Sequence, residues 1–140
     1  TYKQLNLPDS AALAFHQAMV NAPLFPKAFY QAALFFAEQT MFKVSDSIYL
    51  LAEHLKPADA SEQFNKGMSY FARGMNDEGM GMMRGVLKKD DKFYQAWYVI
   101  AAMYHKSGEP NDSVNFYLNK CLAVAPGFGP AVELKKQLQE

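Results

Sequence analysis

Apolar side chains recur at helical spacing in three short stretches of this chain. Each stretch opens with an aromatic residue, has apolar or small residues three and four positions later, and reaches a second aromatic residue at the seventh. The stretches are Phe29–Phe36, Phe64–Phe71 and Trp97–Tyr104, and the intervals between their starts are 35 and 33. Residues at these spacings share one face of an α-helix, so each stretch is predicted to be a helix with one buried face.

A second periodic stretch follows each of these helices after a short break. All three second stretches close with the same five-residue step, which runs from Ala52 to Pro57, from Val86 to Asp91 and from Cys121 to Pro126. Proline lacks the amide proton that a helix interior needs and restricts the residue before it. The repeating unit is therefore predicted to be a helix, a turn and a second helix.

Polar residues at the turns and at both ends extend this pattern. Ser45-Asp46 and Asn76-Asp77 are predicted N-caps of second helices. Asp9-Ser10 is predicted to cap a leading half repeat that runs to about Asn21. After the last unit, apolar residues alternate with polar ones over residues 128–139, which suits a capping helix. The sequence thus predicts eight helices in an all-α fold.

These residues resemble the tetratricopeptide repeat, whose signature is an aromatic, two small or apolar residues and a second aromatic, then small and aromatic residues before a closing proline. The third unit carries it as Trp97, Ile100-Ala101, Tyr104, Ser113, Tyr117, Cys121 and Pro126, and the first as Phe29, Ala32-Ala33, Phe36, Ser45, Tyr49, Ala52 and Pro57. The resemblance implies a right-handed superhelix of stacked antiparallel helix pairs. It places one domain over residues 1–140, with repeats at 26–57, 61–92 and 94–126 and the cap at 128–139.

The middle unit departs from the signature. It has Met68 where a small residue is expected, and its second helix contains the glycine-rich run 79–85. Each interior glycine costs about 1 kcal/mol relative to alanine. This helix is predicted to be the least stable of the stack unless the glycines allow close packing.

The resemblance also implies a concave surface, formed by the first helices of the pairs, that binds a peptide or a helix of another protein. Tyr30 and Tyr98 are the predicted apolar anchors, with a tyrosine at the edge of the core as the alternative for each. The predicted groove residues are Lys27, Tyr30, Leu34, Glu38, Asn65, Ser69, Arg73, Tyr98, Ala102, His105 and Lys106.

One known ligand of the family is not expected here. Some members bind the C-terminal carboxylates of heat-shock chaperones through a lysine and an asparagine of one repeat and basic residues of the next. The corresponding positions in the first repeat hold Tyr30 and Leu34. Lys66 and Arg73 still leave room for another acidic peptide.

Charge and composition limit the classes of partner that the sequence predicts. Fourteen basic residues balance fourteen acidic ones, so no net positive field favours nucleic acid or an anionic membrane surface. The uncharged run 93–105 is shorter than the roughly 18 apolar residues of a spanning helix, so no membrane insertion is expected. A single cysteine, Cys121, excludes an internal disulfide, and both the cytoplasm and a bacterial periplasm remain compatible.

The sequence predicts no enzyme, catalytic residue, metal site or cofactor. His16, His54 and His105 are isolated from one another in the sequence, and none belongs to a ligand spacing. The methionines between Met75 and Met83 suggest core packing or a partner surface more than a copper site or a catalytic role. The alternative to a binding module is a self-association or assembly segment of a larger, possibly cell-envelope, protein that forms a homo-oligomer.

Overall fold

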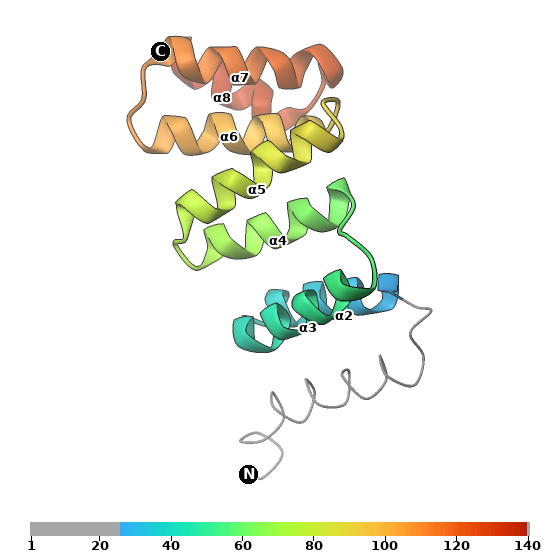
Figure 1. Ribbon diagram of the computed structural model, residues 1–140. Helices are drawn as coiled ribbons and strands as arrows, with labels where there is room; N and C mark the ends of the chain where they lie inside the picture. The colour runs from blue at the N-terminus through green and yellow to red at the C-terminus, as the bar shows by residue number, and fades with distance from the viewer. Residues whose placement is uncertain (1–25, 140) are drawn as a thin grey trace.

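The computed structural model describes residues 26–139, and this part of the chain is all-helical, without strands. The predicted leading half repeat lies outside the described residues. Seven helices occupy the described part (Figure 1): α2 (Pro26–Glu38), α3 (Phe42–Leu55), α4 (Ala60–Ala72), α5 (Asn76–Lys89), α6 (Tyr94–Lys106), α7 (Asn111–Val124) and α8 (Gly129–Gln139).

The helices pack as three pairs, α2 with α3, α4 with α5 and α6 with α7, and contacts between pairs are sparser than contacts within them. The pairs follow one another in the order of the sequence, and α8 lies beside the last pair (Figure 1). The predicted helix content and pairing are thereby confirmed for residues 26–139.

A constant period runs through the helix starts and turns. The first helices begin at Pro26, Ala60 and Tyr94, in two steps of 34. Each ends in a turn whose positive-φ residue recurs at the same interval, at Thr40 (60°), Gly74 (76°) and Gly108 (79°). The amide after each turn donates to a carbonyl five residues back, as from Met41 to Phe36 at 2.9 Å, which satisfies a free carbonyl at the helix end.

This period corrects the predicted alignment of the middle unit, whose spacings were 35 and 33. At a step of 34, Ala33 corresponds to Gly67 and Ala101, and all three are buried. Met68 is 40 % exposed and does not occupy the small-residue position. Aligning the aromatic Phe64 with Phe29 had displaced α4 by one residue.

The second helices need a further correction in the last pair. The link between α6 and α7 is one residue longer than the equivalent links, so α7 begins at Asn111 rather than one residue earlier. Val114, Leu118 and Cys121 therefore take the buried positions of this helix, each with 0 % exposure. The predicted Ser113 and Tyr117 are only half-buried.

Glycines allow α4 and α5 to approach closely. A Cβ added at Gly67 would lie 2.8 Å from the Met82 Cβ, and one added at Gly79 would lie 2.7 Å from the ring of Phe71. Both distances are shorter than carbon atoms tolerate, so larger residues would force the helices apart. Within the glycine-rich run, Gly79 allows this close approach, whereas nothing lies within 4 Å of a Cβ added at Gly81. The helix α5 is continuous over its 14 residues, and its low stability stays a prediction.

The predicted N-caps of the second helices are wrong. The helices α3 and α5 begin after Met41 and Met75, neither of which makes a side-chain cap. Ser45 lies inside α3, where its hydroxyl donates to the Ala33 carbonyl at 2.7 Å and ties the two helices of the pair together. A capping box that the sequence pattern did not reveal opens α4, with Asp59 and Glu62 exchanging side-chain bonds with each other's backbone amides.

The buried residues form three apolar clusters. Among residues 26–139, the buried members of the first all come from α2 and α3 and include Ile48 and Tyr49. The second joins α5 to α6 through Met83 and Ile100 and includes partly buried residues from α4. The third joins α6, α7 and α8 around Leu118. The first pair thus has its own core, whereas the later helices share theirs.

Candidate functional site

A cleft between α2 and α4 brings together four of the predicted groove residues. We call it the inner cleft; its volume is about 190 Å³. The predicted residues on its wall are Leu34, Glu38, Asn65 and Ser69, and the others are Ala37, Phe42, Met68 and Ala72. Its lining is mainly apolar, with one carboxylate and two neutral polar groups.

The α4 side of the inner cleft is a stripe at helical spacing. Asn65, Met68, Ser69 and Ala72 recur at helical intervals, so they share one face of the helix. At the step of 34, Met68 and Ala72 are the counterparts of Leu34 and Glu38. Both residues were missed because the predicted alignment placed the middle unit at a step of 35. The glycines of the two turns, Gly74 and Gly108, carry the correct interval in the sequence itself.

Ser69 places an unpartnered hydroxyl in the wall of this cleft. Its side chain is buried, with 5 % exposure, and its Oγ has no hydrogen-bond partner within residues 26–139. Buried hydroxyls without a partner are uncommon because losing water without a replacement bond is costly. This oxygen has almost no accessible surface, so a bond from a ligand in the inner cleft requires a small movement of the cleft wall. Asn65, one turn away on α4, also lines the cleft.

Arg73 does not line the inner cleft, and its side chain is held by contacts within the protein. Its guanidinium binds Asp46 of α3 through two nitrogens, at 2.7 and 3.1 Å. It also stacks on the rings of Phe42 and Tyr70, at 5.0 and 4.8 Å from their centroids. The predicted role of Arg73 as a free polar contact is therefore corrected, because its charge is already neutralised.

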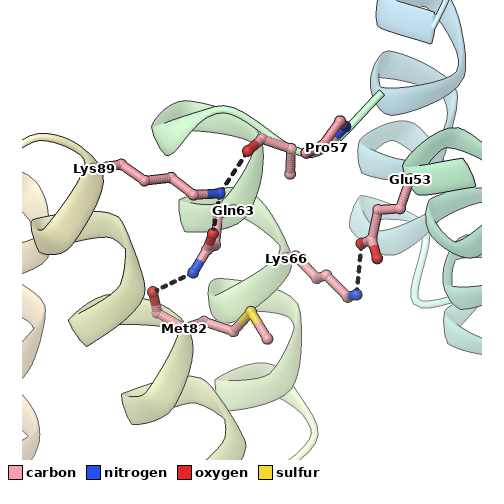
Figure 2. Close-up of a pocket in the computed structure, with 7 residues that line it drawn as sticks. Glu53, Pro57, Gln63, Lys66, Met82 and Lys89 are labelled. Carbon is pink, nitrogen blue, oxygen red and sulfur yellow. Dashed lines mark hydrogen bonds and ion pairs between the residues drawn. The ribbon is translucent and has the colours of Figure 1, made fainter. Parts of the chain in front are cut away.

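Lys66 is committed in the same way. Its ammonium pairs with Glu53 at 2.7 Å in a second cleft, at the junction of α3, α4 and α5 (Figure 2). In that cleft Lys89 donates to the Ala58 carbonyl and to the Gln63 side chain, and Gln63 donates to the Met82 carbonyl. These polar contacts hold the first two pairs together. Lys66 and Arg73 are paired with carboxylates of the chain itself, so the suggested binding of an acidic peptide by these two residues is not supported.

Tyr30 is part of the core. It is only 2 % exposed, and its hydroxyl donates to the Lys56 carbonyl at 2.5 Å. Burial, followed by the charge of Glu53 and other carboxylates, raises the pKa of Tyr30 to about 12. Tyr30 is therefore a core residue, as the alternative interpretation held, and the prediction that it anchors a ligand is wrong.

The remaining predicted groove residues lie away from the inner cleft. Lys27 is exposed at the start of α2, and His105 and Lys106 are exposed at the end of α6. Tyr98 is half-buried and packs edge to face on Phe128, with ring centroids 5.5 Å apart. Ala102 is half-buried beside the third cluster. Tyr98 keeps an accessible part, so its role as an anchor stays a prediction.

The cysteine and two of the methionines are buried in the core. Cys121 is fully buried, and burial raises the pKa of its thiol. Met80 and Met83 are buried in the second cluster, whereas Met75 is 37 % exposed at the turn before α5. Within residues 26–139, no three acidic, histidine or cysteine side chains come together as metal ligands.

Comparison with the known protein families finds no match for this chain, and comparison with curated proteins finds none either. The resemblance to the tetratricopeptide repeat therefore stays a prediction, whereas the helical fold with paired helices is observed. No helix among the described residues is long and apolar enough to cross a membrane.

Proposed function

We propose that this chain is a protein-binding module of the tetratricopeptide type, whose pairs form a superhelix with α2, α4 and α6 on the concave side. The support is the period of 34, which recurs in the starts of the first helices and in the positive-φ turns and equals the length of that repeat. Stacked helical repeats use their concave surface for extended binding sites.

The inner cleft is the proposed binding site, and the observation that carries it is the meeting of α2 and α4 residues around the unpartnered Ser69 hydroxyl. Its ligand is a short segment of a partner protein with one apolar side chain. That side chain packs between Leu34 and Met68, while Ser69 and Asn65 bind a polar group of the segment. Glu38 at the rim favours a neutral or basic residue next to it.

The test starts from peptides selected for binding to the purified chain from a displayed random library. Fluorescence anisotropy then compares their affinity for the wild-type chain and for Met68→Asp. A carboxylate in the apolar wall loses the packing and must be desolvated when the peptide binds. We expect an affinity loss of about tenfold or more, which equals about 1.4 kcal/mol.

Met75→Asp is the matched control, because Met75 has nearly the same exposure, 37 % against 40 % for Met68, and does not line the inner cleft. Circular dichroism should show equal helicity for both variants. Equal loss of binding in both, or selected peptides that bind Met68→Asp as tightly as the wild type, would reject the inner cleft as the site.

A further inference from the structure

One face of α2 is exposed, although the equivalent faces of α4 and α6 are covered. At the step of 34, Phe35 corresponds to Ser69 of α4 and to Met103 of α6. Phe35 is 56 % exposed, whereas Ser69 is 5 % exposed and Met103 is half-buried. An exposed phenylalanine of this kind is uncommon in a folded domain. We call this surface the leading face of α2; its residues, at helical spacing, are Ala28, Gln31, Ala32 and Phe35.

In the two later pairs, the second helix of the preceding pair lies against this face. On α4, Lys66 binds Glu53 of α3 at 2.7 Å. On α6, Ile100 is 1 % exposed and shares a buried cluster with Met83 of α5. Lys66 and Ile100 are the counterparts of Ala32 at one and two steps of 34. The leading face of α2 is thus the position at which a preceding second helix would pack.

The two sides of each joint match in polarity. The cation Lys66 meets the carboxylate Glu53, and the apolar Ile100 packs with the apolar Met83. The leading face of α2 carries no charge, since its only polar member is the amide of Gln31. A segment that covers it should be apolar too, because burying an unpaired charge there would be costly.

The sequence supplies an apolar segment at the required place. Residues 8–21 stand one step of 34 before α3, and Pro8 takes the position of its first residue, where proline is favoured. The α3 positions that meet α4 and its C-cap are 46, 49 and 53. Their counterparts are Ala12, Phe15 and Met19, which are all apolar.

The distance along the chain is also the same. The links between successive pairs contain four residues each, 56–59 and 90–93. Residues 22–25, between the apolar segment and α2, give a link of equal length. A link this short keeps the segment and α2 of one chain together, which favours this segment over one from another molecule.

We propose that residues 8–21 dock on the leading face of α2 in the same chain. Phe15 and Met19 then lie against Ala32, as their counterparts in α3 lie against Lys66. The driving force is the removal of apolar surface from water. Because α2 also forms one wall of the inner cleft, the docked segment would hold that wall in place.

The experiment transplants the ion pair of the first joint into the proposed one. Ala32→Lys and Met19→Glu are made singly and together in the full chain, and urea denaturation followed by circular dichroism gives the equilibrium constant for unfolding. Each single variant leaves an unpaired charge at the joint, which favours unfolding. The double variant should unfold about three- to fivefold less readily than the product of the single effects predicts.

A matched control places the same charge elsewhere on the segment. His16→Glu replaces Met19→Glu in the cycle, because its counterpart in α3 is Leu50, which is 60 % exposed. No coupling with Ala32→Lys is expected in this cycle. Equal coupling in both cycles, or none in either, would overturn the proposal.

A second comparison does not depend on charge. Phe35→Ala should raise the equilibrium constant for unfolding about tenfold or more, because the docked segment covers this ring. The control is Phe116→Ala, at a phenylalanine of nearly equal exposure (52 % against 56 %), which should change the constant less than about threefold. Equal effects of the two substitutions would show that nothing covers the leading face.

Sedimentation of the Ala32→Lys, Met19→Glu double variant identifies the occupant. A monomer that retains the coupling supports docking within one chain. Coupling found only in a dimer would overturn the proposal in favour of exchange of the segment between two copies. None of these residues lines the inner cleft. Failure here therefore leaves the peptide test with Met68→Asp on the wild-type background unaffected.

Discussion

The joint between the first pair and α4 differs in chemistry from the joint between α5 and α6. At the first joint two ion pairs cross from α3 to α4 and its C-cap, Glu53 with Lys66 and Asp46 with Arg73. At the second joint a continuous apolar cluster crosses from Met83 to Ile100, both of them nearly inaccessible to water. The first joint is therefore held by polar contacts that are partly solvated, whereas the second has a buried apolar centre with a polar cleft at its edge.

This difference predicts which contact between helix pairs opens most easily. Partly exposed ion pairs contribute about 1 kcal/mol or less each and weaken with salt. A fully buried aliphatic side chain contributes several times more. The inner cleft lies at the polar joint, since its walls come from α2 and α4. We therefore expect small rotations at that joint to adapt the cleft to a ligand while the later helices stay fixed.

The largest effect is expected from Ile100→Ala at the second joint. Ile100 is 1 % exposed, so its truncation leaves a cavity and should lower the free energy of unfolding by about 2–5 kcal/mol. Urea denaturation followed by circular dichroism measures the change. Leu50→Ala, at a leucine that is 60 % exposed, should stay within about 0.5 kcal/mol of the wild type. A small effect of Ile100→Ala would show that the second joint is not the tighter one.

The next effect tests the close packing within the middle pair. Gly67→Ala should lower the free energy of unfolding by about 1–3 kcal/mol, because the added methyl group meets Met82 and Met83. Gly81→Ala is the matched control, since nothing lies within 4 Å of a Cβ added there. That control should stabilise the helix by about 1 kcal/mol. The same sign for both substitutions in urea denaturation would contradict the packing described here.

A smaller effect is expected at the polar joint. A double-mutant cycle with Asp46→Asn and Arg73→Met should give a coupling energy of about 1 kcal/mol in dilute buffer, because the pair is bidentate but partly exposed. The coupling should fall in about 1 M salt, where the screening length is near 3 Å. A coupling of several kcal/mol, or one insensitive to salt, would make the first joint as rigid as the second.

The helices and their pairing follow from the sequence because aromatic spacing, prolines and turn residues all indicate the same elements. The register of α4 does not, since Phe64 and Gln63 compete for the position of Phe29 and apolar spacing alone favours the phenylalanine. Ion pairs such as that of Arg73 with Asp46 join residues far apart in the chain. Such pairs depend on how two helix pairs dock, which local patterns do not encode.

The smallest effect at neutral pH concerns the buried tyrosines of the first pair. The pKa of Tyr30 is about 12 in the folded chain against about 10 when unfolded, mainly because of burial. Burial also raises the pKa of Tyr49. The stabilisation that comes from keeping Tyr30 neutral is complete below pH 10 and is lost as the pH rises from about 10 to 12. Tyr30→Phe should flatten the alkaline decline in unfolding free energy; an unchanged decline would contradict the assigned pKa.

The central claim is that local opening occurs most easily at the polar joint beside the inner cleft. Amide hydrogen exchange measured separately for each helix tests this claim most directly. On the free protein, amides of α2 and α3 should exchange before those of α6 and α7, and added salt should widen the difference. A peptide selected for the inner cleft should then slow exchange in α2 and α3. Uniform exchange across all three pairs, unaffected by salt, would contradict the account.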